Sequence, residues 1–85
     1  MYHLYIVRCA DGTLYTGITV DLTRRVTEHN TSKPGAKYTR TRRPVRLVYS
    51  KKFRSRSAAS RAEYRIKNLS RREKLALVKW GLDGE

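Results

Sequence analysis

Residues 2–19 read YHLYIVRCADGTLYTGIT, and this stretch decides the fold. Two runs rich in β-branched and aromatic residues, 2–8 and 13–19, flank the triplet Ala10-Asp11-Gly12. Such runs favour β-strands, and the triplet has the composition of a tight turn. The stretch therefore predicts a β-hairpin.

The length of the hairpin loop determines which side chains share a face. A two-residue Asp-Gly turn would put Tyr5 and Tyr15 on opposite faces. A three-residue loop, with Gly12 in the left-handed conformation, would instead pair Cys9 with Thr13. We predict this second register because it gathers the aliphatic side chains for burial. It places Leu4, Ile6, Leu14 and Ile18 on one face, and His3, Tyr5, Val7, Tyr15 and Gly17 on the other.

A short helix and a loop are expected after the hairpin. Asp21 is a suitable N-cap for a helix over residues 22–30. On that helix Leu22, Val26 and His29 share one side, with Arg25 at its edge. Residues 31–44 lack periodicity and contain Pro-Gly, which predicts a loop.

The remaining chain predicts one strand and two helices. Alternation of Val45, Leu47 and Tyr49 indicates a strand over residues 45–50. A helix over 57–68 should follow, and the capping box Ser70-x-x-Glu73 should open a last helix that ends at Gly81. The helices should bury Ala59, Ala62, Ile66 and Leu69, and then Leu75, Leu77 or Val78, and Trp80. We therefore predict one α/β (α+β) domain over residues 1–81, a three-stranded antiparallel sheet flanked by three helices, with a loose tail at 82–85.

The charge of the chain predicts a polyanionic partner. Lys and Arg number 20 against seven Asp and Glu, which gives a formal net charge of +13 over 85 residues. Nucleic acid relieves such self-repulsion because phosphate contacts release counterions. The 31–44 loop is the expected phosphate-binding segment, with Tyr38 available for base stacking. Its candidate binding residues are Lys33, Lys37, Tyr38, Arg40, Arg42 and Arg43.

Composition also bears on the compartment. No apolar run approaches the ~18 residues that a membrane span needs, and no signal segment opens the sequence. A single cysteine, Cys9, closes no intrachain disulfide. We expect a cytoplasmic protein that does not bind membranes.

Elimination among the few acidic residues leaves Glu63 as the candidate for a catalytic or metal-binding carboxylate. The others belong to turns, caps, the tail or, for Glu28, the outward side of the first helix. Glu63 lies three residues before Ile66, close to the buried stripe of its helix. It could bind a metal, form a structural ion pair with an arginine, or complete a Ser60-x-x-Glu63 capping box. One carboxylate suffices for a Mg²⁺ that keeps most of its waters.

Phosphodiester hydrolysis needs an activated water and stabilisation of charge on the phosphate. Tyr5 and Tyr15, on one face beside Arg25, could activate a water if nearby cations favour the phenolate. Arg25 could clamp a phosphate oxygen, and His29 could relay a proton. Each residue also has an ordinary structural explanation, so the combination is what indicates catalysis.

This combination resembles the GIY-YIG nuclease family, which includes excision-repair nucleases, homing endonucleases and some restriction enzymes. Its Gly-Ile-Tyr motif corresponds to His3-Leu4-Tyr5 and its Tyr-Ile-Gly motif to Tyr15-Thr16-Gly17. The family arginine, histidine and glutamate match Arg25, His29 and Glu63. The likeness covers nearly the whole chain and looks closest to the small, stand-alone bacterial members.

The resemblance implies a tyrosine that activates water, an arginine that binds the scissile phosphate and a glutamate that holds one Mg²⁺ or Mn²⁺. We therefore expect an endonuclease that cuts DNA with little sequence specificity, in structured or single-stranded form. A protein partner could supply specificity. The alternatives are a non-catalytic DNA- or RNA-binding module and a ribosome-associated basic protein with the same fold.

Overall fold

The computed structural model describes residues 1–31 and 42–83, with side chains up to residue 79, and centres on one antiparallel sheet. Strand β1 (Tyr2–Arg8) lies between β2 (Leu14–Thr19) and β3 (Arg46–Phe53). Four consecutive β1 residues, from Leu4 to Val7, are buried. A strand buried on both faces must have cover on each side.

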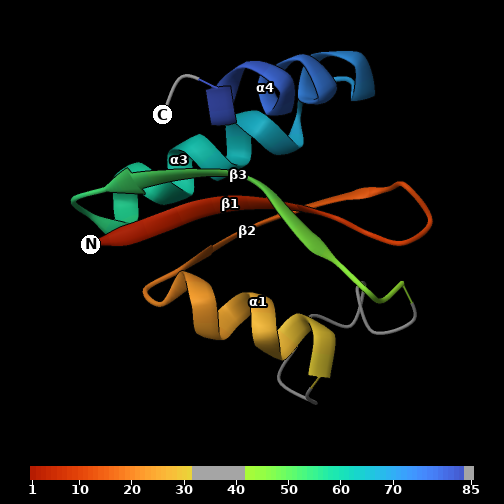
Figure 1. Ribbon diagram of the computed structural model, residues 1–85. Helices are drawn as coiled ribbons and strands as arrows, with labels where there is room; N and C mark the ends of the chain where they lie inside the picture. The colour runs from red at the N-terminus through yellow and green to blue at the C-terminus, as the bar shows by residue number, and fades with distance from the viewer. Residues whose placement is uncertain (32–41, 84–85) are drawn as a thin grey trace.

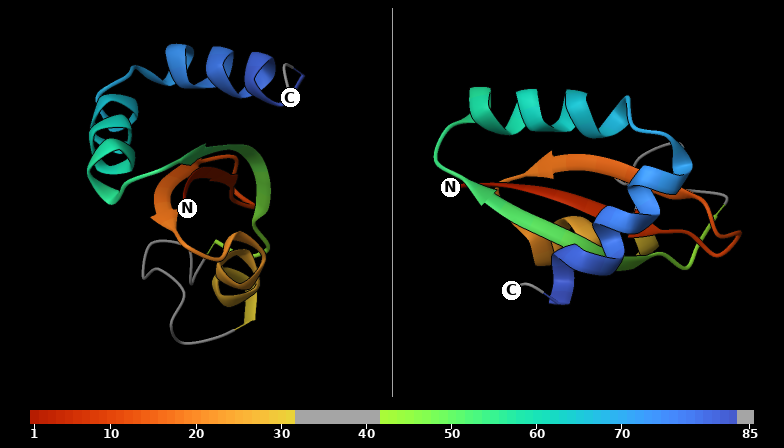
Figure 2. Two further views of the ribbon diagram at one scale, coloured as in Figure 1. Left: turned by 90° about the vertical axis from the view of Figure 1, so that its left-hand side faces the viewer. Right: turned by 90° about the horizontal axis from the view of Figure 1, so that it is seen from above.

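Helices supply that cover from opposite sides (Figure 1). Helix α1 (Leu22–Thr31) lies against one face. Helices α3 (Arg56–Lys67) and α4 (Arg71–Asp83) lie on the other, as the two views of Figure 2 also show. The predicted α/β class, with three strands and three helices, is confirmed for the described residues. None of the helices in these residues is long and apolar enough to cross a membrane.

The hairpin has the predicted three-residue loop. The backbone N–H of Cys9 donates to the carbonyl of Thr13 at 2.8 Å, and Gly12 takes a φ of +86°. Tyr5 therefore pairs with Gly17. The two faces sort as expected, because Leu4 and Ile6 belong to the cluster under α3 and α4, whereas Tyr5 and Val7 belong to the cluster under α1.

Helix α1 begins at the predicted cap. The carboxylate of Asp21 accepts a hydrogen bond from the backbone N–H of Arg24 at 3.0 Å. Leu22 and Val26 pack into the cluster beneath the helix, and His29 is fully buried. The amphipathic assignment of this helix is confirmed.

The simple alternation predicted for the third strand is wrong. Ile6 pairs with Tyr49 but Val7 pairs with Leu47, so Val48 is an extra residue at a bulge. An extra residue reverses the alternation on its two sides. Leu47 consequently packs toward α1, whereas Tyr49 packs with the opposite cluster.

Ser55 caps the N-terminus of helix α3, and its hydroxyl accepts a hydrogen bond from the backbone N–H of Ala58 at 3.1 Å. That start excludes the Ser60-x-x-Glu63 capping box, because both residues lie inside the helix. The predicted core positions Ala59, Ala62 and Ile66 are buried, and Leu69 is partly buried.

Two expectations for the last helix are wrong, although its Ser70–Glu73 capping box is present. Helix α4 continues through Gly81 to Asp83, since glycine weakens a helix by only about 1 kcal/mol and does not forbid it. Leu75 is 39% exposed. It lies two residues from Leu77, about 200° around the helix, so both cannot face the core.

Candidate active site

The ring of Tyr5 reaches from β1 across the backbone of its partner strand at Gly17. A Cβ atom placed on Gly17 would lie 2.7 Å from the Tyr5 hydroxyl oxygen and 2.8 Å from Cζ. No real Cβ tolerates such contacts. The glycine of the second sequence motif is therefore required by the tyrosine of the first.

Tyr5 and His29 form a buried polar pair. The Tyr5 hydroxyl lies 2.8 Å from His29 Nε2, and the two residues are 1% and 0% exposed. The half-buried ring of Tyr15 meets the imidazole edge-on, with ring centroids 5.3 Å apart. Two strands and one helix thus bring both tyrosines to one histidine.

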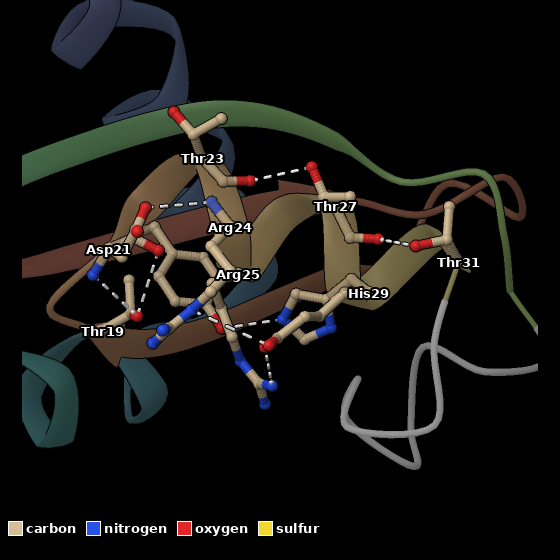
Figure 3. Close-up of polar contacts among 10 residues, drawn as sticks. Thr19, Asp21, Thr23, Arg24, Arg25, Thr27, His29 and Thr31 are labelled. Carbon is tan, nitrogen blue, oxygen red and sulfur yellow. Dashed lines mark hydrogen bonds and ion pairs between the residues drawn. The ribbon is translucent and has the colours of Figure 1, made fainter.

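Arg25 borders this pair from the preceding turn of α1. Figure 3 shows Arg25 and His29 on one side of α1 and Thr23 and Thr27 on the other. The Arg25 side chain is 25% exposed, and its Nη1 donates to Glu28 Oε1 at 3.1 Å. A guanidinium so placed is accessible to an anion while its orientation is held.

Burial strengthens the preference of both members of the polar pair for their uncharged forms. It raises the pKa of Tyr5, although hydrogen bonding from Arg25 opposes the shift. It also lowers the pKa of His29 to about 4, helped by the positive charge of Arg25. A phenol therefore faces an uncharged imidazole. The cost of burying a phenolate charge is larger than the effect of Arg25, so Arg25 by itself does not favour a phenolate at Tyr5.

Glu63 approaches the site from α3. Its charge contributes to the raised pKa of Tyr5, so the carboxylate lies within electrostatic reach of the phenol. Its side chain is 22% exposed and lies 3.3 Å from the Lys67 ammonium. The structural ion pair considered above thus exists, with a lysine. An i,i+4 surface pair of this kind contributes only about 0.5 kcal/mol, which does not account for the acid.

A family model described as the GIY-YIG catalytic domain matches residues 1–76. The chain belongs to the GIY-YIG family. The expected resemblance is thereby confirmed, and the three-stranded α/β fold described above agrees with it. GIY-YIG domains are nuclease domains that generally use divalent metal ions.

Relatives of similar size share nearly the full domain. The chain is 62% identical over 78 residues to the UPF0213 protein DP2720 of Desulfotalea psychrophila, covering 92% of this chain and 71% of that protein. The solution structure of the UPF0213 protein BH0048 from Bacillus halodurans is 49% identical, with a TM-score of 0.61 over 94% of this chain and 85% of that one. The solution structure of EF2693 from E. faecalis is 44% identical, with a TM-score of 0.63 over 92% and 82%. None of these three names states an activity.

Sequence reasoning missed Glu28 in this GIY-YIG domain by placing it on the outward side of α1. It is half-buried, and its carboxylate pairs with Arg25 at 3.1 Å and with Arg24 at 3.8 Å. The i,i+3 spacing from Arg25 was the signal available in the sequence. Glu28 is therefore the acidic partner that holds the guanidinium of Arg25 beside the polar pair.

Two of the residues expected to bind phosphate are tied into the fold. Arg42 Nε donates to Asp11 Oδ2 at 3.0 Å, and Arg43 Nε donates to the carbonyl of His29 at 2.6 Å. These contacts anchor the end of the loop to the hairpin and to α1. The other candidates, Lys33, Lys37, Tyr38 and Arg40, lie outside the described residues.

Glu63 fits the metal requirement of the GIY-YIG family in its chemistry. Within residues 1–31 and 42–83 there is no group of three His, Cys, Asp or Glu side chains that could hold an ion. Mg²⁺ accepts one protein carboxylate and keeps its other ligands as water. The partly exposed carboxylate of Glu63 can supply that single protein ligand.

Proposed function

We propose that the protein is a metal-dependent endonuclease that hydrolyses phosphodiester bonds of DNA with low sequence specificity. The observation that carries the proposal is the 2.8 Å contact between the buried Tyr5 hydroxyl and His29, with Arg25 beside it. Burying polar groups costs free energy unless they are hydrogen-bonded, as Tyr5 and His29 are, and perturbed groups of this kind concentrate at functional sites.

Exposure gives the two tyrosines different roles in this proposal. Tyr5 is 1% exposed and has a raised pKa, so it is poorly placed to take a proton from water. Its hydroxyl instead fixes the imidazole of His29. Tyr15 is half-buried and lies edge-on to the same imidazole. We therefore assign the water-activating phenol to Tyr15 and a positioning role to Tyr5.

Arg25 and Glu63 bracket the reacting phosphate in the proposal. Arg25 supplies a fixed guanidinium that binds the phosphate oxygens once they displace Glu28. Glu63 would hold one Mg²⁺ or Mn²⁺, which when bound neutralises phosphate charge and acidifies its own water. Binding of the phosphate to Arg25 also reduces the positive potential at His29, which makes the imidazole a better proton acceptor.

The test is DNA cleavage with matched variants. Supercoiled, linear and single-stranded DNA, and RNA, are incubated with protein and Mg²⁺ or Mn²⁺, with and without chelator. Glu63→Gln and Arg25→Ala should each lower the cleavage rate by ~100-fold or more, since each removes charge stabilisation at the phosphate. Tyr15→Phe should lower the cleavage rate as strongly.

Lys67→Ala is the control for Glu63. If the acid only paired with this lysine, then Lys67→Ala and Glu63→Gln would have the same effect; we expect Lys67→Ala to keep most of the activity. Cutting that persists unchanged in Glu63→Gln and Arg25→Ala would indicate a contaminant. Salt-sensitive binding without cutting of any substrate would favour the non-catalytic binding module, which the charge of +13 also supports.

A further inference from the structure

The side of α3 that points away from the sheet carries an exposed aromatic ring. Tyr64 is 70% exposed, and it lies in a surface hollow of about 530 Å³. Among the described residues, the hollow is lined by Ser57, Ser60, Arg61, Tyr64 and Arg65, which we call the α3 outer face. Both views of Figure 2 show this side of α3 uncovered by α1 or α4.

The charge on this face is of one sign. Arg61 and Arg65 flank Tyr64, one turn apart on the helix. Neither arginine forms an ion pair with any described residue, and none of the five lining residues is acidic. Two guanidinium groups without an acidic partner among the described residues lie on either side of an exposed ring. This arrangement suits a ligand in which an aromatic group is flanked by negative charges.

We propose that the α3 outer face binds an unpaired nucleic-acid strand. A base stacks on the ring of Tyr64, and the phosphates beside it contact Arg61 and Arg65. The inference depends on the proposed function only in taking nucleic acid as the substrate, because binding here needs no cleavage. Glu63 precedes Tyr64 on the adjacent side of the same helix, so a strand on this face continues toward the proposed site of cutting.

The aromatic contact makes the face selective for single strands. In a duplex each base face is covered by its neighbours, whereas an unpaired base has a free face to stack. Phosphate contacts alone bind both forms. Tyr64 therefore provides a preference for frayed, looped or single-stranded regions that the arginines do not provide.

The experiment measures binding in chelator, where metal-dependent cutting does not occur. Fluorescence anisotropy measures the affinity of the protein for labelled 15-nucleotide oligo-dT, for oligo-rU and for a duplex of the same length. Tyr64→Ala should weaken single-strand binding about tenfold, the equivalent of one stacked base, and change duplex binding less than about twofold. Tyr64→Phe should bind like wild type because it keeps the ring. Comparison of oligo-dT with oligo-rU identifies the preferred sugar.

Leu75→Ala is the matched control, since it removes another exposed apolar side chain, from α4. Arg61→Ala and Arg65→Ala should each reduce the slope of log affinity against log salt by about 0.7 on single strands. Alanine favours helices, so none of these variants should disturb α3.

Photocrosslinking separates this proposal from the catalytic one. A strand carrying 5-iodouracil should crosslink to Tyr64, in wild type and in Glu63→Gln alike, as mapped by mass spectrometry. Single-strand affinity that is unchanged in Tyr64→Ala would overturn the proposal. A dimer that Tyr64→Ala dissociates, with strand affinity unaffected, would assign the face to a second copy of the chain and also overturn it. Neither strand affinity nor crosslinking requires cleavage, so both can be measured in Glu63→Gln even if that variant does not cut.

Discussion

The hydroxyl of Tyr5 occupies the space that any side chain at position 17 would need. In Gly17→Ala the ring must move, because the new Cβ would lie 2.7 Å from the hydroxyl oxygen. We expect the free energy of unfolding to fall by about 1–3 kcal/mol, as for other overpacked sites, together with loss of cleavage. Urea denaturation checks the first effect. In a Tyr5→Val background, Gly17→Ala should lower the free energy of unfolding far less. An equal loss in both backgrounds would show that the new Cβ does not clash with the Tyr5 ring.

Burial of His29 links stability to pH. Its pKa is lowered to about 4 in the folded protein from an ordinary value of 6.5. Between these values the unfolded chain binds the proton and the folded chain does not, so the free energy of unfolding falls as pH drops from 6.5 toward 4. The loss should be on the order of 2 kcal/mol.

Urea denaturation between pH 7 and pH 4.5 measures this dependence. His29→Gln removes the titrating group and keeps a polar side chain, so its stability should vary less across the same window. If wild type and His29→Gln show the same pH dependence, the shift does not arise at His29.

The residues of the site were partly predictable from sequence. Tyr5, Tyr15 and Gly17 follow from the hairpin register, because one loop length fixes every pairing along the two strands. Arg25 and His29 follow from helical spacing. The raised pKa of Tyr5 and the role of Glu28 did not follow, because each depends on burial and side-chain direction, which spacing alone does not determine.

At the scale of elements, the position of α1 depends on its first turn. Asp21 caps this turn, and no acidic residue lies within the first turn of the helix itself. Asp21→Ala should lower the free energy of unfolding by about 1 kcal/mol, whereas Asp21→Ser should retain most of it. Thermal denaturation measures both. Equal stability of Asp21→Ala and wild type would show that the cap contributes nothing.

The β3 bulge shows where element prediction failed. Val45, Leu47 and Tyr49 alternate in sequence, but Val48 between the last two is also apolar, and such a run alone does not distinguish a bulged strand from a straight one. The extra residue at Val48 lets Leu47 pack under α1 while Tyr49 packs toward α3. Both sides of the sheet are apolar, so burial alone does not decide to which side each residue belongs.

For the whole molecule, a charge of +13 predicts binding that is strongly sensitive to salt. With four or more phosphate contacts, affinity for duplex DNA should fall at least ~100-fold between 50 and 200 mM salt. Anisotropy titrations in chelator measure this loss. Glu63→Gln should keep the same slope, since it removes no cation, and affinity that is independent of salt would contradict an electrostatic interface.

The architecture as a whole was predictable because three local signals agree: one hairpin, one capped helix after it, and two helices after a third strand. The electrostatic influence of Glu63 on Tyr5 was not derivable from residue patterns. It joins α3 to a strand some 58 positions earlier in the chain, and only the packing of α3 against the sheet brings the two near.

The middle strand of the sheet is the first one in the chain, and this order matters during synthesis. The hairpin closes one edge of β1 early, but the other edge waits for β3, which begins at Arg46. Until that segment leaves the ribosome, the nascent chain presents an open row of backbone donors and acceptors next to an apolar strand. A polypeptide stalled before residue 46 should therefore associate with other strands, and the finished protein should not.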